Sequence, residues 1–335
     1  MTLRRFVAAL ISIALGGFLV LLLARIAHIH WQETLQQLRD TSWMAFVELV
    51  LLNVMAVYLS TAKWRSVDSF LRRPGDVIPS QVVSISLTSI GMAIGLLVPV
   101  QLGMTVARTL GTYVHGSPLR RGTVGTLLEQ SFDVLTVFIL AIASAFTLMT
   151  KGGATTWVAS ALVLILLCFT FIGPLVRWVR RFTASEKFPK GNPDARFGKL
   201  LTQISEMASS PVFNPALAQK LVILSTLRYA TLVLMTAQTA HMIGAAIPLW
   251  QLAAAGPFVV AASVLAITPG GIGVNELTYA TVLRSLGTPL AAAAQWAIAN
   301  RVLATASCFA VAAIAATYLI VQSLLGKSAA VNADL

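Results

Sequence analysis

Six charged side chains lie inside or directly beside long apolar stretches of this sequence, three of them basic and three acidic. A charge at membrane depth is costly, so it faces the interior of a helix bundle, where it pairs with another charge or lines a polar cavity. Guanidinium groups bind phosphate through two parallel hydrogen bonds, whereas carboxylates bind protons, cations or amines. The six residues are Arg108, Arg228, Arg301, Glu129, Asp133 and Glu276.

Two interpretations of these six residues are open. In the first, the opposite charges pair with one another and only fix the helices in place. In the second, they form a polar substrate site near the middle of the membrane, where the arginines bind a phosphate group. Glu129 and Asp133 are four positions apart, so they share one helix face and should point into the bundle together.

The sharpest local motif is PGGIGVNE, which begins at Pro269. Proline ends a helix, and the glycines at Gly270, Gly271 and Gly273 give the backbone freedom that other residues lack. Glu276 then falls in the first turn of the helix that resumes. A helix end at membrane depth presents unpaired N–H groups, which can hold an anion such as phosphate. The alternative is a plain extracellular turn capped by Glu276.

The composition requires a membrane to position these residues. Hydrophobic residues make up 57% of the 335 positions and charged residues only 11%, and the mean hydropathy is +0.82. Soluble domains are about a quarter charged. We therefore expect an all-α, polytopic integral membrane protein that forms a single transmembrane domain over residues 1–335.

The net charge of +12 has a simple explanation in such a protein. Lys and Arg accumulate in cytoplasmic loops and meet anionic lipid headgroups there, so the charge does not indicate a nucleic-acid partner. Cys168 and Cys308 lie in apolar runs without metal-ligand spacing and are interpreted as packing residues. The sequence contains no GxxxxGK[ST] phosphate loop, HExxH or GxSxG motif. We expect no catalytic residues, no metal and no cofactor, and therefore not an enzyme.

Eight apolar runs are candidates for membrane crossings. They cover residues 6–24, 43–62, 80–98, 122–150, 154–176, 216–240, 248–268 and 289–325. The first is longer than the apolar part of a signal peptide and is followed by no clear cleavage site, so it is interpreted as a transmembrane helix. Basic residues place both termini and the loop 177–215 in the cytoplasm, in a cell inner membrane. Glu48 and Lys63, near the ends of their run, are interpreted as interfacial.

The charged loops leave two of the eight runs without room for a simple crossing. Arg120 and Arg121 put the start of the fourth run on the cytoplasmic side, where the third run also begins. Residues 80–119 are therefore predicted to enter and return as a re-entrant hairpin that breaks near Pro99, and residues 248–287 to do the same from outside. Broken backbone at membrane depth must be surrounded by protein or a wet cavity. This arrangement gives six spanning helices plus two re-entrant helical hairpins.

An internal repeat supports the two hairpins. Pro79 and Pro248 are 169 positions apart, and Pro99 and Pro269 are 170 apart, each of the latter followed four residues later by a glycine. The first-half glycine is Gly103, and Gln101 makes that motif looser than its counterpart. Since the loop charges orient the halves oppositely, we predict an inverted-topology repeat. Its halves are residues 43–150 and 216–325.

Taken with Arg301, Arg108 and the Glu129–Asp133 pair, the PGGIGVNE motif resembles the flippase-like transmembrane family named after the membrane region of lysylphosphatidylglycerol synthase. The resemblance covers nearly the whole chain. It implies a lipid flippase that moves a modified phospholipid, a polyprenyl-linked lipid or a hopanoid-type lipid between leaflets. The synthases carry an aminoacyltransferase domain after this region, whereas this chain ends soon after its last apolar run. We therefore expect a stand-alone member that does not synthesise the lipid.

The expected function is thus translocation of a lipid with a phosphate headgroup, without ATP hydrolysis by the chain itself. The substrate site would comprise the six charged residues together with Pro269, Gly270, Gly271 and Gly273. Two alternatives remain. One is a proton-coupled secondary transporter of a small solute, and the other is a non-transporting membrane partner of a lipid-modifying enzyme.

The orientation is testable by chemical labelling in spheroplasts. We expect Lys190→Cys, in the basic loop, to resist a membrane-impermeant thiol reagent added from outside, because positive loops stay in the cytoplasm. The reagent should react after the membrane is permeabilised. Labelling of the cysteine in intact spheroplasts would show that the topology is reversed.

Overall fold

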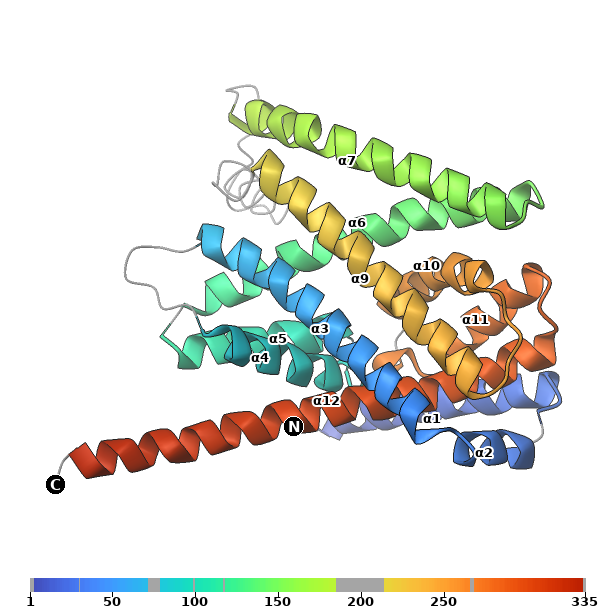
Figure 1. Cartoon of the computed structure of the whole chain (residues 1–335), viewed down its shortest axis with the longest axis horizontal. Helices are drawn as coiled ribbons and strands as arrows, with labels where there is room; N and C mark the ends of the chain where they lie inside the picture. Colours follow the sequence, from blue (N-terminus) through green and yellow to red (C-terminus); the bar gives the residue numbers. More distant parts are fainter. Residues whose placement is uncertain are drawn as a thin grey trace.

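The computed structural model describes residues 3–29, 31–71, 79–98, 100–116, 118–184, 214–265 and 268–333. Within these ranges the chain is helical and contains no strand, which confirms the expected all-α class (Figure 1). The elements are α1 (Leu3–Ile26), α2 (Trp31–Arg39), α3 (Trp43–Leu71), α4 (Gln81–Ile94), α5 (Val100–Val114), α6 (Leu119–Met149), α7 (Ala154–Ala184), α9 (Pro215–Met242), α10 (Leu249–Leu265), the short 3-10 helix η1 (Pro269–Gly271), α11 (Val274–Ser285) and α12 (Leu290–Ala333).

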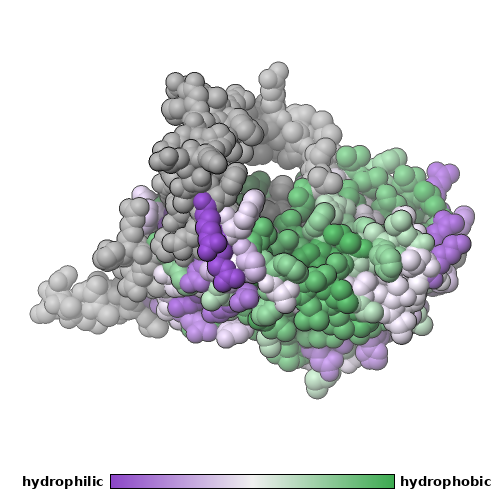
Figure 2. All heavy atoms as spheres, turned by 90° about the horizontal axis from the view of Figure 1, so that it is seen from above, coloured by the Kyte–Doolittle hydropathy of each residue, from purple (hydrophilic) through white to green (hydrophobic). Residues whose placement is uncertain are grey.

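Helices α3, α6, α7, α9 and α12 each contain a stretch long and apolar enough to cross a membrane. Helices α1 and α2 pass the same test only as a pair, and they are bent by 105° after Ile26. His28 stands in this bend with a φ of 52°, which an α-helix cannot accommodate. Figure 2 shows hydrophobic residues gathered in the middle of one face, with hydrophilic residues to either side, as a membrane belt requires.

Several helices begin where the sequence supplies a start signal. The Ser80 hydroxyl accepts a hydrogen bond from the Val83 N–H at the start of α4, at 3.3 Å. Asn214 caps α9 by accepting from the Ala216 N–H at 2.9 Å, and Pro215 occupies the first helical position. The predicted basic loop 177–215 begins inside α7, which continues to Ala184. Residues 185–213 lie outside the described residues.

Two helical hairpins lie where the sequence predicts them. Helices α4 and α5 form the first hairpin, and α10 and α11, joined through η1, form the second. The helices of the first hairpin approach very closely, because an ideal Cβ on Gly103 would lie 2.7 Å from Gly95 Cα and 2.8 Å from Gly91 O. Only glycine permits this approach. Entry of the two hairpins from opposite membrane faces stays a prediction.

The helices of the two halves pack in corresponding ways. Helix α5 packs on α6 as α11 packs on α12. The leading helix of each hairpin packs on the long helix of the other half, α4 on α12 and α10 on α6. The first helices of the two halves, α3 and α9, pack on each other. This pattern is what an internal two-fold relation between residues 43–150 and 216–325 would produce. Helix α7 lies outside it, at the edge of the molecule opposite α12 (Figure 1).

The breaks of the two hairpins lie close together. Gly270 has a φ of 56°, and a Cβ on it would lie 2.6 Å from the carbonyl oxygen of Leu96, in the turn just after α4. Glycine is therefore required at this position both for its φ and for the close approach. Helix α1 covers the second break, because Gly16 O would lie 2.6 Å from a Cβ on Gly273. Pro99 lies outside the described residues.

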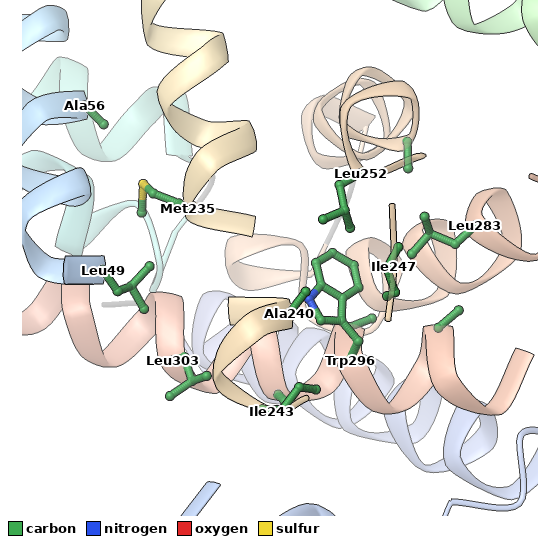
Figure 3. Packing of buried hydrophobic residues seen from close by; sticks show 14 residues of the cluster. Leu49, Ala56, Met235, Ala240, Ile243, Ile247, Leu252, Leu283, Trp296 and Leu303 are labelled. Atoms are coloured by element: carbon green, nitrogen blue, oxygen red, sulfur yellow. The ribbon is translucent and has the colours of Figure 1, made fainter. Parts of the chain in front are cut away.

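A buried cluster around Trp296 fixes α12 against the second hairpin and the α3–α9 pair. Its labelled members come from five elements and from the connection after α9 (Figure 3). The Trp296 ring meets the Tyr279 ring edge to face, with their centroids 4.9 Å apart. Such aromatic pairs contribute about 0.5–1.5 kcal/mol beyond the area that they bury. This packing sets the rotation of α12 about its axis and thereby the direction of Arg301, five residues further on.

The close approach within the first hairpin predicts the effect of adding one methyl group. Gly103→Ala should reduce the free energy of unfolding by about 1–3 kcal/mol, because the new Cβ meets backbone atoms that can only move together. Gly17→Ala in α1 is the matched control, since no atom lies within 4 Å of the added Cβ. Denaturant unfolding of purified protein in detergent measures both changes. Equal stability of the two variants would contradict the close packing.

Candidate functional site

Five charged side chains from four helices meet in the interior, and together they form what we call the buried charge cluster. The members are Lys63 on α3, Arg108 on α5, Glu129 and Asp133 on α6, and Arg228 on α9. Three cations face two carboxylates, so the cluster carries one surplus positive charge. Charges buried in a low-dielectric interior must be paired and hydrogen-bonded.

Lys63 lies at the centre of the cluster. Its ammonium group is 2.9 Å from Glu129 Oε1 and donates a hydrogen bond to Asp133 Oδ1. Its third interaction is with the Ser225 hydroxyl on α9, at 3.3 Å. The side chain is fully buried. Lys63 thus joins α3 to α6 and to α9 through the three donors of one ammonium group.

Arg108 is also fully buried, and its guanidinium group is held on every side. Nη1 donates to Glu129 Oε2 at 2.8 Å, and Nη2 donates to the Ser60 hydroxyl at 3.0 Å. Nε and Nη2 both donate to the Thr88 hydroxyl, at 3.3 and 3.2 Å. The guanidinium carbon lies 5.0 Å from the centre of the Trp64 ring, a cation–π contact. Every nitrogen of this guanidinium group therefore already donates within the protein.

Arg228 and Asp133 form the more accessible side of the cluster. Arg228 Nη1 lies 3.1 Å from Asp133 Oδ2, and the two side chains are 16% and 17% exposed. Arg228 Nε is buried and has no hydrogen-bond partner among the described residues. An unfilled charged donor in the interior is costly, and an acceptor bound to this atom would remove that cost.

The placement of Lys63 corrects the interfacial interpretation of this residue. The apolar run ends at Ala62, but α3 continues to Leu71, so Lys63 is inside a helix rather than at its end. Its side chain turns to the carboxylates of α6 instead of reaching for the membrane surface. The six charges chosen from the sequence already balance, three basic and three acidic, so counting charges gives no signal that Lys63 belongs with them. Glu48, by contrast, is exposed and accepts a hydrogen bond from Gln238.

A second ion pair lies in the other half of the chain. Arg301 Nε donates to Glu276 Oε1, and Glu276 Oε2 accepts from the Gly273 N–H at 2.6 Å. The carboxylate therefore caps α11 and holds α12 at the same time. Arg301 Nη2 is buried without a hydrogen-bond partner among the described residues, and so is the hydroxyl of Thr268, the residue before the motif.

The PGGIGVNE motif has the local structure that the sequence predicts. Gly270, Gly271 and Gly273 have φ values of 56°, 70° and 81°, in the region that favours glycine. Pro269 begins η1, and Glu276 stands in the first turn of α11. Glu276 therefore caps the turn with one oxygen and pairs with Arg301 through the other, while the side of the membrane on which the turn lies stays a prediction.

Each of the three predicted arginines pairs with one of the three predicted carboxylates, but the pairs form two sites. Ser225 on α9 contacts Lys63, whereas Thr239 on α9 donates to Asn300, the neighbour of Arg301, at 2.8 Å. These α9 positions are fourteen residues apart, about 21 Å along the helix. The six charges therefore do not share one centre.

The comparisons with known proteins bear on the whole of this arrangement. The family described as Lysylphosphatidylglycerol synthase TM region matches residues 7–319, which include both sites and both hairpins. The chain belongs to this family. Searches of curated proteins and of solved structures returned no match. Family membership makes the chain a multi-pass membrane domain of a kind associated with lipid handling, which agrees with its apolar helices.

The central role of Lys63 is testable by removing its charge. Lys63→Met should reduce the free energy of unfolding by about 1–3 kcal/mol, because Glu129 and Asp133 each lose one of two cationic partners, while Arg108 and Arg228 still pair with them. Lys151→Met, at an exposed turn after α6, is the control. Thermal unfolding in detergent compares them, and Lys63→Met as stable as Lys151→Met would refute the role.

Proposed function

We propose that this chain moves a lipid with a phosphate headgroup between the leaflets of the cell inner membrane, with both termini in the cytoplasm. One observation carries the proposal. Both sites contain an arginine with a buried, unfilled donor, Arg228 Nε and Arg301 Nη2, and the buried charge cluster has a surplus positive charge. A phosphodiester monoanion supplies the missing charge and the missing acceptors together.

Asp133 allows such an anion to bind without breaking the cluster. Its two oxygens are divided between Lys63 and Arg228. A phosphate that takes its place at Arg228 leaves the carboxylate paired with Lys63, so no buried charge loses all its partners. Arg108, each of whose guanidinium nitrogens already donates within the protein, would hold Glu129 in position while this exchange occurs.

The spacing of the two sites suits a stepwise crossing. From Arg228 to Thr239, which contacts Asn300 beside Arg301, α9 rises by about 16 Å, whereas the hydrocarbon core is about 30 Å thick. A headgroup passing from one arginine to the other would cover about half of the crossing, and neither step requires ATP. The paired hairpins, interpreted as an inverted-topology repeat, place broken backbone beside this route, as transporters with such repeats do.

The test is lipid movement by the pure chain in proteoliposomes that contain a fluorescent phosphate-headgroup lipid. Arg228→Ala and Arg301→Ala should each slow movement about tenfold or more, because a hydrogen bond to a charged group contributes about 1.5–3 kcal/mol. Arg39→Ala, at an exposed position in α2, should leave the rate unchanged. Equal rates for all three variants at equal protein density would remove both arginines from the route.

A double variant separates anion binding from simple ion pairing. Arg301→Gln/Glu276→Gln removes both charges of the second site and leaves neither partner uncompensated. If Arg301 only balances Glu276, this variant should move lipid at the normal rate. If Arg301 binds phosphate, movement stays slow. A pure chain that moves no lipid would favour the proton-coupled transporter or the non-transporting partner.

A further inference from the structure

A cavity of about 400 Å³ lies between the end of α3 and the start of α9. We call it the α3–α9 pocket. Arg65 and Lys220 supply its charges, Ser66 and Ser69 supply hydroxyl groups, and Phe70 and Leu217 supply apolar walls. Ligand pockets for small molecules typically have this size, and they combine a largely apolar lining with a few polar groups. The combination found here suits an anionic amphiphile.

The two positive charges of the pocket have no carboxylate beside them in the described lining. Asp68, the acidic residue nearest in sequence, is bound by Arg121 through Nε at 2.8 Å and Nη2 at 2.6 Å, so it is not available to neutralise Arg65. Among the described residues, Arg65 Nη1 donates only to neutral acceptors, the Pro79 carbonyl at 2.6 Å and the Ser84 hydroxyl at 2.9 Å. These bonds hold a charged guanidinium at the wall of the pocket without cancelling its charge.

We propose that the α3–α9 pocket binds the phosphate headgroup of an anionic phospholipid before the lipid moves, which rests on the proposed function above. Arg65 and Lys220 contact the phosphate, and the hydroxyls of Ser66 and Ser69 contribute further hydrogen bonds. Phe70, which is partly exposed, lies against the apolar part of the lipid. A lipid rather than a free anion is indicated because polar and apolar groups share one cavity.

The position of the pocket connects it to the buried charge cluster. On α3, Ser66 is one helical turn from Lys63, and on α9, Lys220 is five residues before Ser225, about 7.5 Å along the axis. Lys63 and Ser225 contact each other inside the molecule. The pocket therefore stands at the end of the same α3–α9 contact that holds the cluster, and a headgroup released from the pocket reaches Arg228 next.

Lipid binding is measured directly on the full chain in detergent, by native mass spectrometry with short-chain phosphatidylglycerol. Lys220→Glu should weaken binding about tenfold, because it replaces a cation that contacts the phosphate with an anion. Lys151→Glu makes the same charge change at an exposed turn remote from the pocket and should bind like the wild type. Both positions are exposed, so neither change disturbs a packed core. Equal binding of phosphatidylglycerol by the two variants would contradict the proposal that the α3–α9 pocket binds the lipid.

Two further arms separate the remaining possibilities. Inorganic phosphate alone should compete weakly, and competition as effective as that of the lipid would make the pocket a free-anion site and overturn the lipid proposal. In proteoliposomes, Lys220→Glu should raise the lipid concentration for half-maximal movement and leave the maximal rate unchanged. If the wild type moves no lipid in proteoliposomes but Lys220→Glu still weakens phosphatidylglycerol binding in detergent, the proposed function is wrong. Lipid binding by the α3–α9 pocket is then still supported.

Discussion

The ammonium group of Lys63 between the two carboxylates of α6 is the interaction on which the centre of the molecule depends. It brings α3, α6 and α9 together at one point, 2.9 Å from Glu129 and beside Asp133. Arg108 extends the same contact to the first hairpin. Desolvation makes such a network a weak source of net stability, but breaking it is expensive because each member leaves a buried charge behind. The network thus specifies which helices meet rather than how strongly.

The two halves of the chain use the same kind of ion pair with the signs exchanged. In the first half the arginine is on the second hairpin helix, α5, and the glutamate is on α6. In the second half the glutamate is on α11 and Arg301 is on α12. Each pair ties a hairpin to the long helix that follows it. The glycines at Gly103 and Gly270 then bring the broken ends together, since side chains there would meet backbone.

Composition and spacing were enough to predict the helical membrane class, the two hairpins as local elements and the structure of the PGGIGVNE turn. These features depend on neighbours in sequence, on hydropathy, and on the φ values open to glycine. Lys63 was misplaced because hydropathy ends a run at the first charge, whereas the helix continues wherever its backbone bonds are satisfied. The division of six charges into two sites depends on helix packing, which the order of residues along the chain does not specify.

The three arginines differ in whether a buried guanidinium nitrogen lacks a hydrogen-bond partner, and this difference indicates which of them suit a substrate. Arg108 is surrounded by acceptors and an aromatic ring, so its work is internal. Arg228 and Arg301 each keep a buried donor without a partner among the described residues. In the proposed function, the empty cluster carries one surplus charge and the loaded cluster is neutral. A neutral cluster is easier to enclose in a low-dielectric interior, so the neutralisation of the surplus charge itself favours binding of the headgroup.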